Sequence, residues 1–520
     1  MKKISWLLGC CLLGLIAACS SDHDENQVWL APVINGLENS YSLSMGESVT
    51  LSPEVEHAEG AVYSWTLDDE VVSQASVYEF HATKSGTFHL VFSVQTQGGR
   101  TVKSVNMVVL QPEALRLETQ AYEVLAIDLP EAFQGADEVE WKVVSAASDL
   151  YRLQAAGGGK ALFVAARAGK YHGQATSQGL ICDVMITVKE PAKKLSPYIA
   201  KVYDYLPAPG QFVNQLPPYE PGDSHADMVR KAGEWLVGEE ATMITLGGWG
   251  GYVVFGFDHL VLNVAGKRDF RVNGNAFGSA DNGRPNAPFG GSCEPGIVMV
   301  AYDANGNGQP DEDEWYEIKG SSNFSTEKEL WYDFAVENKN DVAVYRDYSM
   351  TYHRPQKEEP ELDAEPGNPL AFATIEKYIR WTDNQNNEGY KVKNVYHNQS
   401  YYPAWVDKDE LQFKGIRLPN NAINEGKFNP GINQGSVYYV LYGFRYGYVD
   451  NYPNLHDNSA IDIDWAIDKE GNAVHLPGIH FVKVYNAINQ ENGWLGECST
   501  EVERGEDLHM LGKRIDTVKE

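Results

Sequence analysis

Alternation of apolar and polar residues with a period of two predicts antiparallel β-strands in the first third of the chain. A strand centred on Trp65 is predicted at residues 62–67. A second alternating run follows at 86–94 and ends before the Gly98-Gly99 turn. Strands of this kind, solvated on one face and buried on the other, are typical of antiparallel sandwiches, and we expect one at residues 29–110.

The same order of elements recurs in the next stretch of the chain. A strand around Trp141 at residues 139–143 is followed by an alternating segment at 168–172 and a closing strand at 184–188. We therefore expect a second sandwich at residues 111–190.

The first stretch places a glycine, an aromatic and an aliphatic residue at alternate positions after the tryptophan strand, as Gly86-Thr-Phe88-His-Leu90, and the second has Gly169-Lys-Tyr171 at the corresponding place. This arrangement resembles the immunoglobulin-like modules called PKD-type domains. Neither module has a cluster of polar side chains suited to chemistry. We interpret them as spacers that lift a working domain away from a membrane, the alternative being that they bind glycan themselves.

The pattern changes after residue 190. A Pro- and Tyr-rich connector reaches to about 221 and is apolar enough to pack along the next domain. Ser224 with Asp227 three residues later resembles a helix-capping arrangement. Met228, Ala232 and Trp235 at helical spacing then predict one short helix over 226–236.

Beyond residue 242 the sequence predicts strands joined by ordered loops. A Gly-rich turn at 247–251 precedes an apolar strand at 252–258, and a further strand follows at 296–302. This order resembles galactose-binding-like jelly rolls, which are double sheets with binding loops at one rim. The predicted fold is thus all-β: two PKD-type sandwiches, then a large jelly-roll-like ligand-binding domain at 191–520 with insertions and one short helix.

Composition narrows the classes of function. The 520 residues include 72 Asp and Glu against 42 Lys and Arg, a formal net charge of −30. Such an acidic surface repels phosphate backbones, so we expect no nucleic-acid partner. The 29 Tyr and 12 Trp favour β-structure and contact surfaces.

The N-terminus has the pattern of an export signal. Residues 1–18 begin with Lys2-Lys3, continue as a short apolar run and end in Ala17-Ala18 before Cys19. This end resembles the lipobox of bacterial lipoproteins, which implies cleavage before Cys19 and acylation of that residue. The alternative is an ordinary secretory signal with an incidental cysteine.

An acidic tether at 19–28 follows the signal. It resembles the surface-export tag of lipoproteins from Gram-negative gut anaerobes and favours an outer-membrane protein that faces the medium. A solvated tether in the periplasm is the alternative. In either case the only contact expected with the membrane is the lipid anchor.

Three cysteines follow Cys19, and an odd number leaves at least one thiol unpaired. Cys182 stands in an apolar alternating run and is interpreted as a small buried residue. Cys293 and Cys498 both fall in the C-terminal region, where we weigh a disulfide between them against two free thiols.

The sharpest motif is a twelve-residue calcium loop at 303–314. Oxygen ligands are expected from Asp303, Asn305, Asn307, the carbonyl of Gln309, Asp311 and a bidentate Glu314, and Gly308 occupies the sixth position, where the backbone turns sharply. The flanking sequences read as strands, so we expect a structural calcium ion in a loop that joins two strands. The alternative is a polar hairpin turn.

A second acidic stretch runs from 457 to 468. Ile461, Ile463, Trp465 and Ile467 are predicted to share one strand face, which would place Asp462, Asp464 and Asp468 together on the other. Such a face could form a second cation site or a carboxylate pair for glycoside hydrolysis. The alternative is the solvated face of an edge strand.

Aromatic residues are the candidates for ligand contact, because a tyrosine offers both a flat apolar face and a hydroxyl. The candidates are Tyr401, Tyr402, Trp405, Tyr446, Tyr448 and Trp249. Tyr401, Tyr402 and Trp405 stand beside Pro403 in a loop-like context and are the ones we expect at the surface.

Motifs for serine, cysteine or zinc hydrolases and for phosphate-binding loops are not found in the sequence, so we do not expect an enzyme. Phrases such as Leu246-Gly-Gly-Trp249-Gly-Gly-Tyr252 and Gly496-Glu-Cys-Ser499-Thr500-Glu501 resemble PKD-bearing cell-surface lipoproteins of gut anaerobes. Some of these are linked to capture of cobamides (vitamin B12) for TonB-dependent transport. The resemblance implies a ligand-capture lipoprotein, with a carbohydrate-binding lipoprotein and a surface glycosidase using Asp462 and Asp464 as alternatives.

Overall fold

The structure is a computed structural model of the 520-residue chain. It describes residues 29–111, 113–133, 138–279, 284–428 and 437–518. The predicted signal, Cys19 and the tether up to residue 28 lie outside these ranges. In the part of the chain that is described, no helix is both long and apolar enough to cross a membrane.

The chain divides into two compact units. Of the described residues, one unit holds 29–111 with 178–180, and the other holds those of 113–177 and 181–518. Almost all the regular structure in both units is β, arranged in sandwich-type sheets, as the residue pattern predicts.

The first unit is a sandwich around Trp65. Its main sheet has the order β2 (Ser40–Ser44), β9 (Gly99–Leu110), β8 (Gly86–Thr96), β5 (Val62–Leu67) and β6 (Glu70–Ser73). Two pairs complete it: β1 (Val33–Asn35) with β4 (Glu54–Glu56), and β3 (Ser48–Leu51) with β7 (Tyr78–His81). Trp65 has no exposed surface and packs on Phe92 with ring centroids 4.3 Å apart. The central tryptophan of the predicted strand is therefore the middle of the core.

The second sandwich opens the other unit. One sheet has the order β10 (Leu115–Gln120), β16 (Leu180–Lys189), β15 (Gly169–Ser177) and β12 (Glu140–Ser145). The facing sheet has the order β11 (Leu125–Asp128), β14 (Lys160–Ala165) and β13 (Tyr151–Gly157). Cys182 is fully buried among these strands as a free thiol, in agreement with its interpretation as a small core residue.

The C-terminal region is built on one six-stranded antiparallel sheet. Its order is β17 (Lys201–Leu206), β19 (Tyr252–Leu262), β34 (Gly478–Asn486), β24 (Gly296–Ala301), β25 (Trp315–Ile318) and β33 (Ala466–Ile467). Strands β19, β34 and β24 are buried along almost their whole length, so their sequences are continuous apolar runs rather than alternating ones.

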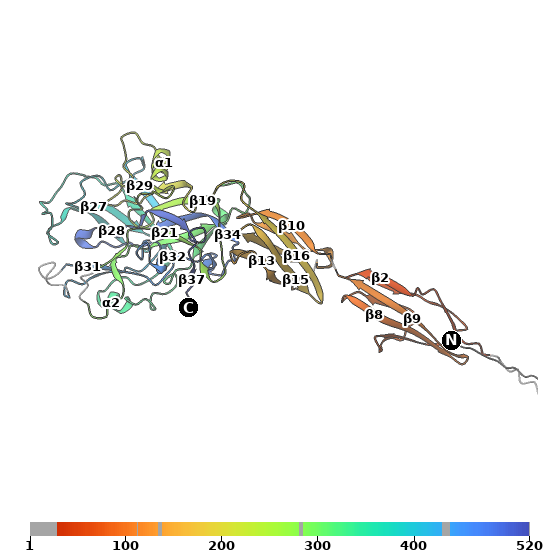
Figure 1. The fold of residues 1–520 in the computed structure, drawn as a ribbon. Coiled ribbons are helices and arrows are strands. Elements are labelled where there is room, and N and C mark those ends of the chain that lie inside the picture. Colours follow the sequence, from red (N-terminus) through yellow and green to blue (C-terminus); the bar gives the residue numbers. More distant parts are fainter. Residues whose placement is uncertain (1–28, 112, 134–137, 280–283, 429–436, 519–520) are drawn as a thin grey trace, which may run out of the picture. The chain divides into compact units, whose positions relative to one another are not determined.

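Smaller sheets surround this central sheet in the C-terminal region (Figure 1). One four-stranded sheet has the order β28 (Glu388–Asn394), β27 (Ala373–Asp383), β26 (Tyr345–His353) and β29 (Glu410–Arg417). Another has the order β22 (Phe277–Gly278), β23 (Gly290–Ser292), β31 (Tyr439–Tyr442) and β30 (Ala422–Asn424). One sheet has three strands, β32 (Ala460–Ile461), β21 (Phe270–Asn273), β36 (Arg504–Asp507), and two are pairs, β18 (Ile244–Thr245) with β35 (Glu501–Val502) and β20 (Lys267–Arg268) with β37 (Ile515–Asp516).

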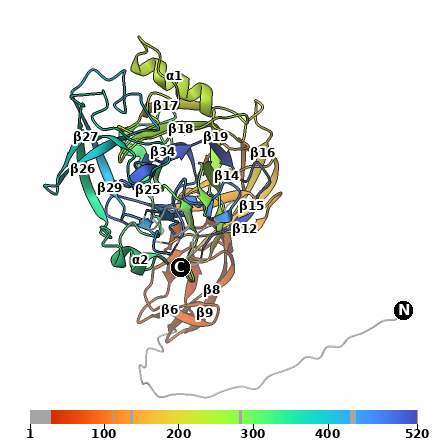
Figure 2. The same ribbon diagram turned by 90° about the vertical axis from the view of Figure 1, so that its left-hand side faces the viewer.

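The predicted helix is present as α1 (His225–Leu236), which lies beside β17 (Figure 2). Ser224 caps it, and Asp227 completes a reciprocal capping box. Met228, Ala232 and Leu236 form its buried face, while Trp235 is only partly buried. A second helix, α2 (Tyr332–Glu337), was not predicted, because six residues give too little helical periodicity to recognise.

Candidate calcium centre and adjoining clefts

The loop 303–314 joins two strands, as predicted. Strand β24 precedes it and β25 follows it, and the two pair antiparallel with Ala301 opposite Trp315. The loop closes with a short 3-10 helix, η2 (Glu312–Glu314). It is therefore held at both ends by the central sheet rather than by the two helices of an EF-hand.

Oxygen-bearing side chains organise the first half of the loop. The Asp303 carboxylate accepts hydrogen bonds from the backbone N–H of Asn307 (3.1 Å) and Gly308 (2.8 Å). Gly308 has φ +71°, a left-handed conformation that suits glycine at the sixth position. The N–H of Gln309 donates to Asn307 Oδ1 at 2.7 Å. The sharp turn that a calcium loop requires is thus already formed.

The second half of the loop folds back onto the first. Asp311 Oδ2 accepts hydrogen bonds from the side-chain amides of Asn305 (2.8 Å) and Asn307 (2.7 Å). Glu314 Oε1 accepts one from the N–H of Ala304 at 2.9 Å. All six predicted ligand residues are therefore linked to one another or to the loop backbone by hydrogen bonds.

Glu314 supplies the observation that fits a cation. Its side chain is 8% exposed, and Oε2 is buried without a hydrogen-bond partner among the described residues. A buried carboxylate oxygen without a partner is costly unless a cation compensates it. No salt bridge joins any carboxylate of the loop to Lys, Arg or His in the described ranges, so the residues suit a hard cation such as Ca²⁺.

A cleft of about 550 Å³ lies against the calcium loop. Asp303 and Gly308 line it from the loop, Tyr203 and Phe481 from the central sheet, and Tyr122 from the second sandwich. Tyr203 and Phe481 meet edge to face, with ring centroids 5.2 Å apart. This volume is in the range of small-molecule sites, and four of the seventeen lining residues are Tyr or Phe.

Tyr122 is the contribution of the second sandwich to this cleft. It has φ +67°, an uncommon conformation for a large side chain, and its ring lies 5.0 Å from that of His259. His259 Nε2 lies 2.8 Å from Asp507 Oδ2, and Nδ1 lies 3.0 Å from Asp258 Oδ1. Burial by itself lowers the pKa of His259, but the two carboxylates outweigh it and the pKa is raised.

An ion pair joins the second sandwich to the C-terminal region within the same unit. Arg152 donates to both carboxylate oxygens of Asp464, at 2.7 and 3.0 Å, and Asn263 donates to Asp464 Oδ1 at 3.0 Å. Burial alone would raise the pKa of Asp464, but these hydrogen bonds and the Arg152 charge lower it. Asp464 is therefore a structural clamp.

The predicted acidic strand face is not formed. Ile463–Trp465 is a 3-10 helix, η4, that interrupts the alternation, with Asp462 as its N-cap. Asp462 is buried, and that burial, together with the charge of Asp269, raises its pKa to about 7. Asp468 lies instead in a turn, where it accepts hydrogen bonds from Asn472. The three carboxylates are thus in three different environments, and the prediction of one shared face was wrong.

Most of the aromatic ligand candidates are core residues. Tyr401, Tyr402 and Trp249 have at most 1% exposed surface, so the predicted surface position of Tyr401 and Tyr402 was wrong. Tyr401 Oη accepts a hydrogen bond from the N–H of Asn394 at 3.1 Å. Trp405, also expected at the surface, is partly buried between Tyr205 and Tyr219. The tetrapeptide around Pro403 looked like an exposed loop because its partners are distant in sequence.

Tyr446 and Tyr448 differ from each other. Tyr448 is 1% exposed; its hydroxyl accepts from the N–H of Ser322 (3.0 Å) and donates to Asn323 Oδ1 (2.9 Å). Tyr446 is also largely buried, but it lines two neighbouring cavities. One of them, of about 360 Å³, also contains Asp462 and Asp464. Of the six aromatic candidates, Tyr446 is the one that lines a cavity described here.

Of the two alternatives weighed for Cys293 and Cys498, the structure has the free thiols. Cys293 and Cys498 are both fully buried free thiols. Burial and the carboxylates around them raise the pKa of both thiols.

A buried acidic cluster was missed by the sequence analysis. Oxygens of Glu294, Asp450 and Glu501 all lie within 4.8 Å of one another. Burial is the largest cause that raises the pKa of Glu294 to about 8 and that of Asp450 to about 7. These residues are far apart in sequence and follow no metal-ligand spacing. The feature that could have indicated them is that each stands in a short polar segment of the sequence: Cys-Glu-Pro-Gly for Glu294, Tyr-Val-Asp-Asn for Asp450 and Ser-Thr-Glu for Glu501.

Backbone N–H groups from several segments of the chain donate hydrogen bonds to the carboxylates of this cluster. Asp450 accepts from the backbone N–H of Asn275 (2.7 Å), Ala276 (2.8 Å) and Glu501 (3.0 Å). Glu294 Oε1 accepts from the N–H of Ser499 at 2.9 Å. The cluster therefore ties together strands that are distant in the chain.

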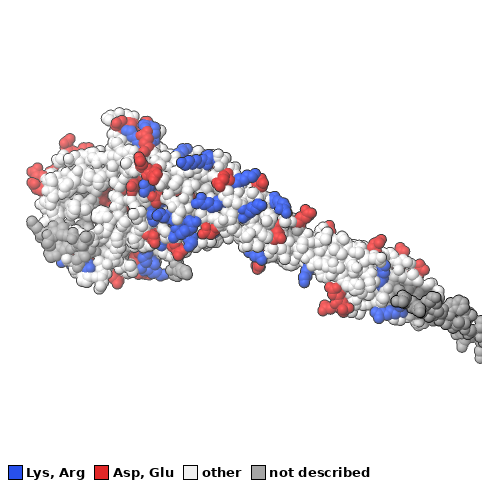
Figure 3. Space-filling model, viewed as in Figure 1, with Lys and Arg blue, Asp and Glu red and all other residues white. Residues whose placement is uncertain are grey.

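On the face shown in Figure 3, basic and acidic side chains are interspersed over the second sandwich.

Comparison with known proteins assigns the N-terminal module. Residues 32–96 match the profile of a PKD-like domain. No curated protein matches the chain. Similar solved structures include a quinonprotein alcohol dehydrogenase-like protein from Bacteroides thetaiotaomicron (22% identity, TM-score 0.14, covering 15% of this chain and 20% of that one).

Immunoglobulin domains are also among the similar structures. Titin domains I67–I69 match with 13% identity and TM-score 0.16 over 31% of this chain and 66% of theirs. Sidekick-1 domains 1–4 match with 13% identity and TM-score 0.16 over 35% and 54%. This chain spans less than two thirds of each of these structures, and at such TM-scores the matches carry no argument about function. The profile match supports one plain conclusion: the first sandwich is a PKD-like domain.

Proposed function

We propose that this chain is a non-catalytic binding protein that holds an amphipathic ligand in the aromatic cleft and uses calcium to fix one wall of that cleft. One observation carries the proposal: Asp303 and Gly308 of the calcium loop line the same cleft as Tyr203 and Phe481. A cation bound by Asp303 would rigidify the loop, and a rigid wall reduces the entropy lost when a ligand binds.

The chemistry of the cleft suits a ligand with both flat apolar faces and hydroxyl or amide groups. Tyr203 is half-buried and presents an aromatic face, and the side chain of Lys201 lies 4.1 Å from its ring centroid. His480 also lines the cleft, and its Nδ1 accepts a hydrogen bond from the N–H of Asp303 at 3.1 Å. Its other ring nitrogen is then the protonated one and is available to donate.

A cobamide is the first ligand to test, because the resemblance to cobamide-capturing lipoproteins supports it. A cobamide exceeds a cleft of about 550 Å³, so the cleft would hold one part of the molecule. A glycan is the second candidate, since the same volume accommodates a few sugar rings stacked on aromatic faces. With a lipid anchor at Cys19, the protein would capture its ligand at the outer membrane and pass it to a TonB-dependent transporter.

Titration of the chain lacking residues 1–19 with cobalamin, and separately with soluble polysaccharides, tests this proposal by calorimetry in calcium and in chelator. We expect saturable binding of one ligand class that weakens when calcium is removed. Hydrolysis of a glycoside would contradict the proposal. So would binding whose affinity is unchanged both by chelation of calcium and by the substitution Tyr203→Ala.

The cleft variant is Tyr203→Ala. Loss of one aromatic contact of about 1 kcal/mol weakens binding about fivefold. Tyr396→Ala is the matched control, because Tyr396 is 43% exposed and does not line the cleft. Equal affinities for the two variants would place the ligand elsewhere on the protein.

A further inference from the structure

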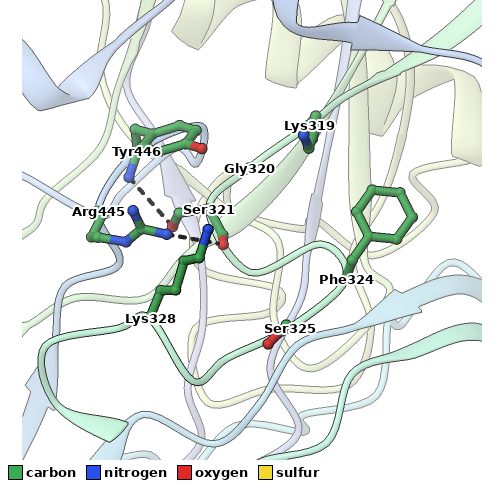
Figure 4. Close-up of a pocket in the computed structure, with 8 residues that line it drawn as sticks. All are labelled: Lys319, Gly320, Ser321, Phe324, Ser325, Lys328, Arg445 and Tyr446. Carbon is green, nitrogen blue, oxygen red and sulfur yellow. Dashed lines mark hydrogen bonds between the residues drawn. The ribbon is translucent and has the colours of Figure 1, made fainter. Parts of the chain in front are cut away.

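A second, smaller cavity lies on the C-terminal region, away from the aromatic cleft. It has a volume of about 240 Å³ and is formed by the segment 319–328 after β25 and by Arg445 and Tyr446 after β31 (Figure 4). Its lining includes three basic side chains, from Lys319, Lys328 and Arg445, and no acidic one. This composition is unusual in a chain with a formal net charge of −30.

Two of these cations converge on the same place. The ammonium group of Lys328 and the guanidinium group of Arg445 both point toward Ser321 (Figure 4), whose backbone oxygen accepts from Arg445 Nη2 at 3.4 Å. Lys328 is exposed and has no carboxylate partner among the described residues. Two like charges directed at one point repel each other unless an anion lies between them.

The buried carboxylate of Glu329 interacts with Arg445 and does not line the cavity. Glu329 is 4% exposed; its Oε1 accepts from Ser322 Oγ at 2.9 Å and its Oε2 from the backbone N–H of Arg445 at 3.0 Å. Arg445 Nε lies 3.7 Å from Glu329 Oε1. Glu329 thus offsets one positive charge, and the cavity retains an excess of positive charge. Glu327, the other nearby acid, is exposed and accepts a hydrogen bond from Ser325 Oγ.

The loop that forms the cavity is held in place by the buried side chains of Tyr448 and Asn323. A Cβ atom at Gly320 would lie 2.2 Å from the ring of buried Tyr448, so only glycine allows the loop to lie this close. The hydroxyl of Tyr448 accepts a hydrogen bond from the N–H of Ser322, and the N–H of Gly320 donates to Asn323 Oδ1 at 2.8 Å. The cations are therefore presented by a fixed loop, which favours binding over rearrangement.

Aromatic rings border the cationic centre. Phe324 is 51% exposed, with the Arg346 guanidinium 4.3 Å from its ring centroid, and Tyr446 packs 5.1 Å from Trp465. An exposed phenylalanine beside a small cationic cavity offers a flat apolar surface to a ring that carries the anion.

We propose that this cavity binds an oxyanion group, such as sulfate, phosphate or carboxylate, carried on a ring-containing molecule. Arg445 and Lys328 contact the oxyanion, and Phe324 contacts the ring. Guanidinium groups match oxyanions through paired hydrogen bonds, and ammonium groups add charge. This site is independent of the ligand proposed for the aromatic cleft.

Calorimetric titration at low ionic strength with inorganic sulfate, inorganic phosphate, glucuronate and glucose 6-sulfate, with glucose as the neutral probe, tests the proposal on the chain lacking residues 1–19. We expect the ring-borne anions to bind more tightly than the inorganic ones, and glucose not to bind. Lys328→Gln is expected to weaken glucose 6-sulfate binding about fivefold. Phe324→Ala is expected to remove the advantage of glucose 6-sulfate over inorganic sulfate.

Lys142→Gln is the matched control, because Lys142 is an exposed lysine of the second sandwich. Equal binding by Lys328→Gln and wild type, or failure of every oxyanion to bind, would overturn the proposal. Equal binding of inorganic sulfate and glucose 6-sulfate would overturn the part assigned to Phe324. Titration of Lys328→Gln with cobalamin, the first probe of the aromatic cleft, should give the wild-type affinity, which separates the two sites.

Discussion

Glu314→Gln is expected to change protein stability in opposite directions in the presence and absence of calcium. In chelator, the wild-type loop carries the buried Oε2 without a hydrogen-bond partner, together with four other carboxylates in the twelve residues. Gln keeps the oxygen that accepts from the Ala304 N–H and removes the negative charge. Because the substitution removes a buried negative charge beside four other carboxylates, we expect the variant to be more stable in chelator by about 1 kcal/mol.

In calcium the order reverses. At a concentration about 100 times the dissociation constant, a ligand that binds only the folded state adds ~2.7 kcal/mol to the free energy of unfolding. The variant lacks the bidentate carboxylate that closes the site, so calcium stabilises its folded state much less. For a unit of roughly 400 residues, with an unfolding entropy of about 2 cal/mol/K per residue, ~2.7 kcal/mol corresponds to about 3 °C in Tm.

Differential scanning calorimetry with and without calcium measures both halves of this prediction. Glu312→Gln is the matched control: it is exposed in the same loop and stands at a position that supplies no ligand. Equal calcium responses of wild type and Glu314→Gln, or a variant less stable than wild type in chelator, would refute the assignment of Glu314 as the closing ligand.

Three other substitutions test the structural interpretations. Burial raises the pKa of Glu294 to about 8 from an ordinary value of 4.5, so its stabilising contribution is present below about pH 4.5 and is lost as the pH rises through about 8. In urea unfolding at about pH 9, Glu294→Gln should therefore be more stable than the wild type. An unchanged pH dependence of the free energy of unfolding would contradict this. Arg152→Ala leaves Asp464 without its main partner and should lower the free energy of unfolding by about 3 kcal/mol, whereas a loss below about 1 kcal/mol would rule out the clamp. Tyr401→Phe removes the bond from the Asn394 N–H and should cost about 1 kcal/mol while leaving ligand affinity unchanged; a selective loss of affinity would restore Tyr401 as a ligand contact.

Local patterns in the sequence determined the elements whose partners are close in the chain. Period-two alternation around Trp65 predicted the strands of the first sandwich, because one buried face leaves a direct imprint on the sequence. The capping residues Ser224 and Asp227 predicted where α1 begins. The spacing from Asp303 to Glu314 predicted a folded loop between two strands, since the hydrogen bonds that shape the turn lie within the twelve residues.

Tertiary structure decided everything that depends on partners distant in the chain. Tyr401 and Tyr402 are buried because strands from elsewhere cover them, and no pattern within their own segment records that cover. The cluster of Glu294, Asp450 and Glu501, and the cavity around Lys328 and Arg445, each join segments more than fifty residues apart. Sequence alone therefore determined many of the strands and turns and the twelve-residue loop 303–314, because these follow from short-range periodicity and backbone conformation. Which side chains meet across those elements was decided by packing, because burial and charge pairing depend on three-dimensional neighbours rather than on sequence spacing.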